Sequence, residues 1–180
     1  MSGSRIRLYG STSGYVELEA PAVAPDGVLT LPATFSSSIR QIVSATNATN
    51  QTTTSASFVD VTGVSVTITP TSDTSKILVV SVMTVYSQRT DQNSTDSYWQ
   101  LTDGSNVALQ GAEGMRVGSS QTLRVNPTFQ IHSPVTLIGL AEPATTSPVT
   151  YKARFRRGND TAGILGATNT SKIYAIEVAV

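Results

Sequence analysis

Most of this chain alternates apolar and polar residues with the two-residue period of a β-strand, and helical periodicity is nearly absent. In Val149–Arg157, apolar residues alternate with Lys152, Arg154 and Arg156, which predicts a half-buried strand. Ile77–Tyr86 is apolar on both alternating faces. A strand of this kind fits a sandwich core or a subunit interface. A short buried helix is the competing interpretation, which the β-branched residues disfavour.

Other alternating stretches complete an all-β pattern. Phe58–Thr69 contains Gly63 near its middle, which predicts a strand with a bend or bulge there. Further strands are expected at Ser97–Thr102, Val107–Gln110, Thr122–Pro134, Val135–Leu140 and Lys172–Val180, with loops at 89–97 and 111–120 and a tight turn at 103–106. About eight strands without helices indicate an antiparallel β-sandwich or jelly roll.

The N-terminal residues form a separate segment of very short strands. Arg5–Tyr9, Tyr15–Glu19 and Val28–Leu31 are the expected strands, and they carry too little apolar surface to fold alone. We therefore expect two parts, an extended attachment arm over residues 1–38 and a head over residues 39–180. The arm would dock on another protein through apolar contacts and through cations that bind acidic groups, with the contact residues Ile6, Leu8, Val16, Leu18, Leu29, Leu31, Arg5 and Arg7.

Composition excludes several classes of function. The 12 basic and 12 acidic residues balance, so no overall field attracts nucleic acid or a membrane surface. The absence of cysteine excludes disulfides and thiolate metal sites. No apolar run is long enough for a membrane helix and no signal-peptide pattern is present, so we expect no membrane insertion.

Few residues could support metal binding or nucleophilic catalysis. His132 is the only histidine, and no Gly-x-Ser-x-Gly motif surrounds any serine. One imidazole is too few for a catalytic zinc site, and a half-buried strand histidine is the alternative. Asp91, Asp96 and Asp103 could hold calcium through their oxygens, or could be solvated loop carboxylates.

Glycoside cleavage would need two opposed carboxyl groups. Glu113 and Glu142 are available, but nothing in the sequence pairs them. We therefore expect a protein that is not an enzyme and has no catalytic residues, cofactor or metal site.

One acidic residue stands out because Glu177 lies between Ile176 and Val178 in an expected central strand. A buried carboxylate requires a partner, so we hypothesise a contact from Glu177 to Arg154 or Arg156, within or between subunits. An exposed edge position for Glu177 is the alternative. Arg154, Arg156 and Arg157 could instead bind an anionic glycan or an acidic capsid patch, or form a solvated strand face.

Two neighbouring aromatic residues, Tyr98 and Trp99, are candidates for stacking on sugar rings. Packing in the core is the alternative for Trp99.

Several segments resemble small virion proteins of tailed phages, especially marine and cyanobacterial phages. The arm segment Gly10–Pro32 is similar to one common in their fibre and appendage proteins. Thr53–Pro70, Ser75–Val80 and the closing strand Lys172–Val178 resemble their C-terminal globular head. The resemblance implies a jelly roll similar to tumour-necrosis-factor and complement-type heads, trimeric and displayed on the particle. It carries over no catalytic residue.

The resemblance and the short chain together predict a structural protein at the virion surface. No repeat, collagen-like tract or coiled coil separates arm from head, which favours a short knob over a long fibre. We expect a homotrimeric surface knob or capsid decoration protein whose arm binds a phage capsid or tail protein. The alternatives are a short tail fibre or receptor-binding tip that recognises host cell-surface glycan, and a polysaccharide-cleaving enzyme.

Overall fold

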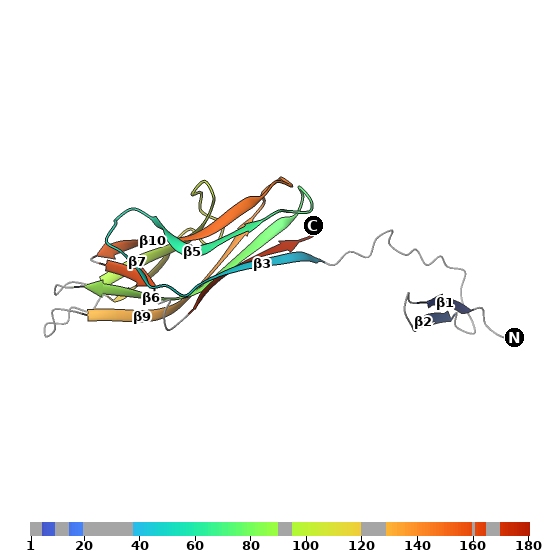
Figure 1. Cartoon of the computed structure of the whole chain (residues 1–180), viewed down its shortest axis with the longest axis horizontal. Helices are drawn as coiled ribbons and strands as arrows, with labels where there is room; N and C mark the ends of the chain where they lie inside the picture. Colours follow the sequence, from blue (N-terminus) through green and yellow to red (C-terminus); the bar gives the residue numbers. More distant parts are fainter. Residues whose placement is uncertain are drawn as a thin grey trace. The chain divides into compact units, whose positions relative to one another are not determined.

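The chain divides into two compact units, Met1–Phe35 and Ser36–Val180 (Figure 1). The computed structural model describes residues 5–9, 15–19, 38–89, 95–119, 129–159, 161–164 and 170–180. We call the second unit the head. Among the described residues, no helix is long and apolar enough to span a membrane.

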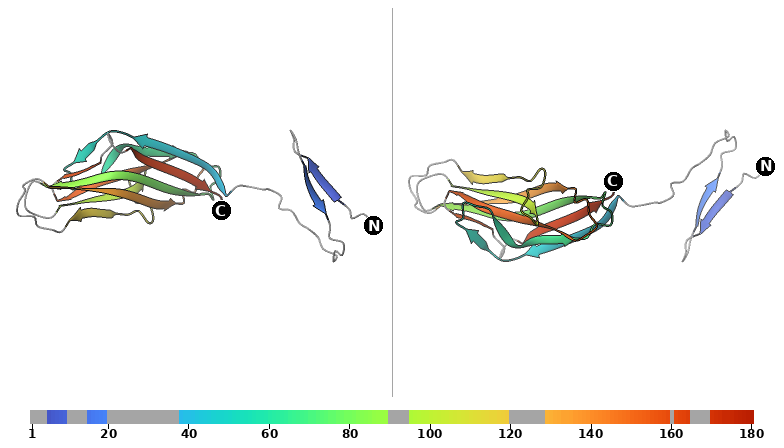
Figure 2. Two further views of the ribbon diagram at one scale, coloured as in Figure 1. Left: turned by 90° about the horizontal axis from the view of Figure 1, so that it is seen from below. Right: turned by 90° about the horizontal axis from the view of Figure 1, so that it is seen from above.

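The head is a sandwich of two antiparallel sheets (Figure 2). Its strands are β3 (Ile39–Asn47), β4 (Gln51–Thr53), β5 (Val59–Ile68), β6 (Lys76–Arg89), β7 (Thr95–Asp103), β8 (Met115–Ser119), β9 (Phe129–Ala141), β10 (Val149–Asn159), β11 (Thr161–Ile164) and β12 (Ser171–Val178). One sheet, here called the β5 sheet, has the order β5-β10-β7-β8. The chain crosses between the sheets repeatedly, and the predicted all-β sandwich of jelly-roll type is confirmed.

The second sheet, here called the β6 sheet, is organised around the long central strand β6. On one side β6 pairs with β9 along its whole length. On the other side it pairs first with β12 and then with β11, and these two strands pair with β3 and β4 respectively. The sheet is therefore four strands wide along β6.

The core lies between the inner faces of the two sheets. The strand β10 alternates as predicted: Tyr151, Ala153 and Phe155 are buried, and the intervening cations point to the opposite face. Trp99 is fully buried and stacks on Phe155 with 5.0 Å between the ring centroids. This pair joins β7 and β10 in the centre of the core.

The predicted bend in β5 is confirmed at Gly63, which has a φ of 79°. Opposite it, the register of β10 shifts: Lys152 pairs with Ser65, whereas Arg154 pairs with Asp60. The extra residues of β5 form an irregularity that glycine accommodates because it adopts positive φ without strain.

The predicted break at Pro134 is wrong, because β9 runs through this residue as one strand. The Leu140 N–H donates to the carbonyl oxygen of Gln110, away from β6. Pro134 lies six residues earlier in the same unbroken register, so its nitrogen also faces away from β6. An edge strand tolerates proline where no ladder hydrogen bond is lost.

The structure also differs from the predicted strands in segments where apolar and polar residues do not alternate clearly. The structure contains β3 and β4, which the sequence did not indicate, and β8, which replaces part of the expected glycine-rich loop. Val107–Gln110 forms isolated bridges instead of a strand. The expected turn at 103–106 is confirmed, since the Asn106 N–H donates to the carbonyl oxygen of Asp103.

Gly118 allows β8 to approach β7 closely, and Gly118→Ala is expected to destabilise the head by about 2 kcal/mol. A Cβ at Gly118 would lie 2.6 Å from Asp96 Cβ and 2.7 Å from Asp96 Cα. Gly114→Ala is the matched control, because its Cβ would have no atom within 4 Å. Denaturant unfolding measures both variants, and equal midpoints would contradict the close approach.

The N-terminal unit contains a β-hairpin of β1 (Arg5–Tyr9) and β2 (Tyr15–Glu19). Both strands lie where the sequence predicted them. The third expected strand, Val28–Leu31, with Leu29 and Leu31, lies outside the described residues.

Candidate functional site

The register of the N-terminal hairpin places apolar positions on one face and charged positions on the other. Ile6 is opposite Leu18 and Leu8 is opposite Val16, so these positions share one face. The other face carries the opposed pairs Arg5–Glu19 and Arg7–Glu17. Cross-strand pairs of opposite charge stabilise a hairpin modestly. A two-stranded hairpin is nevertheless marginal alone in water, so a partner that covers the apolar positions would stabilise it.

The outer face of the β6 sheet is the most apolar surface among the described residues of the head. Its two central rows run across β3, β12, β6 and β9. One row is Ile42, Ile176, Leu78 and Leu140, and the next is Ser44, Tyr174, Val80 and Ile138. Val82 continues the apolar surface along β6. We call these residues, without Ser44, the apolar face.

The residues of the apolar face are accessible to solvent in the single chain. Ile42 is 58% exposed, Ile138 is 53% exposed and Val82 is 43% exposed, while the other members are half-buried. Of the two interpretations of Ile77–Tyr86, a sandwich core would bury both sides within one chain, and the structure buries only one side. One side of β6 is in the core, and the other is covered by nothing in the described residues.

The outer face of the β5 sheet has the opposite character. Asp60 accepts hydrogen bonds from Lys152 Nζ at 2.7 Å and from Arg154 Nε at 2.8 Å. Partial burial opposes ionisation, but these cations hold the pKa of Asp60 below its usual value. The Arg156 guanidinium lies 3.9 Å from the Tyr98 ring centroid. This face is charged and its cations already have partners within the head.

The expected contact between Glu177 and an arginine is not formed within the chain. Glu177 is fully buried in β12, whereas Arg154 and Arg156 lie in β10 of the other sheet. The carboxylate accepts hydrogen bonds from Gln41 Nε2 at 2.6 Å and from the Thr71 N–H and hydroxyl at 2.7 Å each. These neutral donors satisfy the buried charge, so Glu177 is a structural residue and is not accessible to another subunit.

The hydrogen bonds also determine the pKa of Glu177. Burial raises the pKa, but donation from Thr71 and Gln41 outweighs burial and lowers it from 4.5 to about 2. The group is therefore ionised at neutral pH.

The two candidate stacking residues do not present a platform for sugar. Trp99 has no exposed surface, and its Nε1–H donates to Ser97 Oγ at 2.8 Å, so the core alternative holds. Tyr98 is half-buried beneath Arg156.

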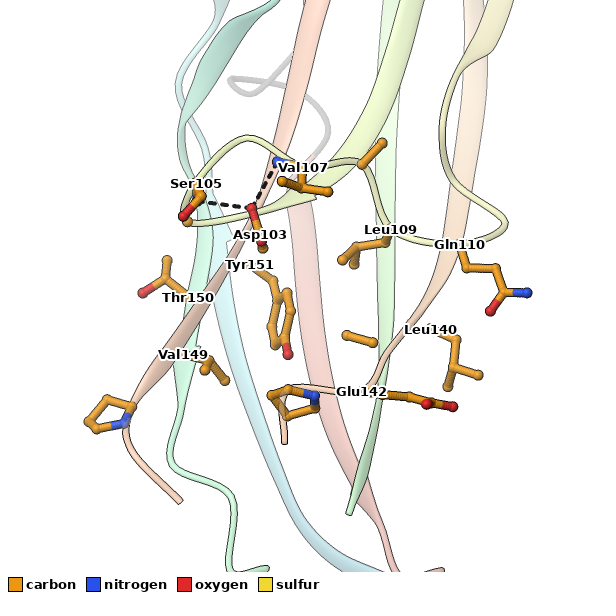
Figure 3. Close-up of a pocket in the computed structure, with 15 residues that line it drawn as sticks. Asp103, Ser105, Val107, Leu109, Gln110, Leu140, Glu142, Val149, Thr150 and Tyr151 are labelled. Carbon is orange, nitrogen blue, oxygen red and sulfur yellow. Dashed lines mark hydrogen bonds between the residues drawn. The ribbon is translucent and has the colours of Figure 1, made fainter. Parts of the chain in front are cut away.

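A pocket of about 570 Å³ lies between the turn after β7, the end of β9 and the start of β10 (Figure 3). The Tyr151 ring lies among the lining residues, and its hydroxyl is on the side of the ring nearer to Glu142 (Figure 3). Burial and the negative charge of Asp103 raise the pKa of Tyr151 to about 12. Tyr151 is 2% exposed, and its hydroxyl is protonated at neutral pH. Leu109, Leu140 and Val149 supply apolar walls.

The remaining polar candidates have local partners. His132 is exposed on β9 and stacks on Tyr86 with centroids 5.7 Å apart. Asp96 bonds Arg116 at 2.9 Å. Asp103 Oδ1 accepts from the Ser105 and Val107 N–H groups.

The two candidate acids for glycoside cleavage are likewise engaged. Glu113 accepts from the Gly111 N–H at 3.1 Å, and Glu142 bonds Lys76 at 2.8 Å. Asp91 lies outside the described residues, among which no cluster of three or more histidine, aspartate or glutamate residues could hold a metal ion.

Comparisons with known proteins give distant structural similarity alone. No protein family and no curated protein sequence matches the chain. Among solved structures, it is similar to VP2 of infectious bursal disease virus, in a subviral particle, with 16% identity and a TM-score of 0.31. The similarity covers 95% of this chain and 46% of that one. The Gx strain of that virus gives 18% identity, 95% and 46% coverage, and a TM-score of 0.29. The chain thus spans less than half the length of the proteins it matches.

Proposed function

We propose that the protein is a structural component of a virus particle, a homotrimeric surface knob or capsid decoration protein of a tailed phage. Its N-terminal hairpin anchors it to a capsid or tail protein, and its head is displayed outward. In this function the protein needs no catalysis and no cofactor.

The observation that carries the proposal is the two-unit organisation of the chain. The hairpin belongs to the compact unit Met1–Phe35, and its register gathers Ile6, Leu8, Val16 and Leu18 on one face. Burial of such a face against another protein, or addition of an unpaired strand edge to a partner sheet, would supply the missing stabilisation. The segment Gly10–Pro32, which resembles phage appendage proteins, belongs to this same unit.

Deletion of residues 1–34 is expected to abolish recovery of the protein with purified particles, because the anchor is lost. The head keeps its whole core and should unfold at the same temperature as in the full chain. The measurement is the amount of protein that cosediments with particles, beside thermal unfolding by circular dichroism. Normal coating by the truncated protein would refute the anchor.

A point variant tests the anchor within the full chain. Leu8→Glu with Val16→Glu places charges on the apolar hairpin positions and should reduce recovery at least roughly tenfold. Ser11→Glu with Ser13→Glu adds the same charge between the two strands and should leave recovery unchanged. Equal losses in both variants would argue against specific docking.

Glycan recognition is the second candidate function, and the Tyr151 pocket is the observation that favours it. A neutral sugar could use the protonated Tyr151 hydroxyl, the Gln110 amide and the apolar walls. Binding of host-cell glycans by the purified protein, and its loss in Tyr151→Phe, would support this function. Retained binding in Tyr151→Phe would exclude the pocket.

A further inference from the structure

The apolar face leaves an unusual amount of apolar side chain accessible in a single chain. Ile42, Val82 and Ile138 are each more than two-fifths exposed, and they lie within one continuous surface. Contiguous apolar patches of more than a few hundred Å² are rare on monomers and mark interfaces. A half-solvated antiparallel sheet would instead carry polar residues at these outward positions.

We propose that this outer face of the β6 sheet packs against second copies of the head and forms the subunit contact of the trimer. This inference rests on the proposed function, whose structural assembly it deepens by naming the contacting surface and its partner. Each head would turn its β6 sheet toward its neighbours, and the charged β5 sheet would face solvent.

The outer surface of the β6 sheet is large enough to contribute to such contacts. Four strands spaced about 4.8 Å apart, along the 14 residues of β6 at about 3.4 Å each, give a surface of roughly 15 by 45 Å, or roughly 700 Å². A head in a trimer contacts two neighbours, so this surface would supply part of the about 800 Å² that each partner buries in each standard interface. The apolar face is its centre, and Ser44, Thr46, Thr84 and Thr136 lie around it.

The distribution of charge favours a copy of this chain over a partner selected by charge. The two central rows contain no charged residue. Lys172 lies in the next row beside Val82, and Lys76 and Glu142 pair with each other at 2.8 Å at the end of the sheet. Interfaces between identical subunits are more apolar than other interfaces and are depleted of charge in their centre. The β5 sheet, by contrast, carries Asp60, Lys152 and Arg154 outward.

The proposal is tested by the mass of the full chain in solution. We expect sedimentation equilibrium at micromolar concentration to give three times the chain mass for the wild type. Ile138→Glu should weaken association roughly a hundredfold or more, because each contact would bury an unpaired carboxylate. Ser65→Glu, an exposed position on the outer face of the β5 sheet, should leave the mass unchanged. An Ile138→Glu protein that associates like the wild type would overturn the proposal.

A second measurement does not require the subunits to separate. The chain contains no cysteine, so Ile138→Cys and Ser65→Cys each provide one thiol. In the assembled protein, we expect maleimide to label Ile138→Cys at least tenfold more slowly than Ser65→Cys. After dilution to monomers, we expect the two thiols to react at similar rates. Equal rates at the assembling concentration would overturn the proposal even if Ile138→Glu fails to fold.

The remaining outcomes separate this inference from the proposed function. Association abolished by Leu8→Glu with Val16→Glu, but not by Ile138→Glu, would place self-association in the hairpin and overturn the proposal. A monomeric wild type whose Ile138→Cys thiol is shielded on particles would mean that a different protein covers the face, which also overturns it. Neither result would affect the cosedimentation assay for the anchor.

Discussion

Trp99→Ala is expected to lower the free energy of unfolding by about 4 kcal/mol, the largest effect of any single substitution proposed for this chain. Trp99 has no exposed surface and stacks on Phe155 between β7 and β10. Its removal leaves a cavity that the two sheets cannot close, and it also removes the donor to Ser97 Oγ. Small domains have roughly 5–15 kcal/mol of stability, so the loss is a large fraction of the total.

Urea unfolding followed by circular dichroism measures this effect. Trp99→Phe is the matched control, because it keeps an aromatic ring against Phe155 and loses less volume. We expect Trp99→Phe to retain more than half of the stability lost in Trp99→Ala. A Trp99→Ala protein as stable as the wild type would contradict the placement of this ring in the core.

Glu177→Gln is expected to destabilise the head by about 2–3 kcal/mol at pH 7 and to change how stability depends on pH. The buried carboxylate accepts hydrogen bonds from Gln41 and Thr71. In Glu177→Gln, an amide NH2 group replaces one carboxylate oxygen and would face at least one of these donors, from which it cannot accept a hydrogen bond. Because the pKa of Glu177 falls from 4.5 to about 2 on folding, the unfolded chain binds the proton more readily. This stabilisation is therefore complete above about pH 5 and is lost as pH falls through about 2.

The measurement is the difference in unfolding free energy between wild type and Glu177→Gln from pH 6 to pH 2. The difference should shrink as the pH falls, while other carboxylates, including Asp60, contribute equally to both proteins and cancel. A difference that stays constant over this range would show that Glu177 is not ionised in the folded head.

The fold was predictable where the apolar pattern is strong. The alternation in β10 and the glycine bend in β5 follow from local sequence, and the structure contains both. The strands β3 and β4 were missed because few of their residues are apolar, and their exposed positions include Arg40, Ser44, Thr46 and Thr52. Their pairing with β12 and β11 is also long-range. The break predicted at Pro134 was wrong for a related reason. A proline interrupts a strand only where its nitrogen faces a neighbouring strand, and the sequence does not show on which side the neighbour lies.

The candidate surfaces were predictable in part. The apolar residues on both sides of Ile77–Tyr86 indicated a subunit interface as one of two interpretations, and the exposed side of β6 favours that one. The partners of Glu177 were not predictable, because Thr71 lies 106 residues earlier in the chain and no motif links the two. The local sequence pattern predicts which residues share one face of a strand. The partners of a buried charged residue depend on tertiary packing.

Imaging of purified particles with a label on the C-terminus of the chain tests the central claim most directly. The account predicts labelled, three-fold knobs at regular positions on the capsid or tail surface, and no knobs on particles assembled with the chain that lacks residues 1–34. Particles that contain no label, or label distributed without relation to any surface feature, would contradict it.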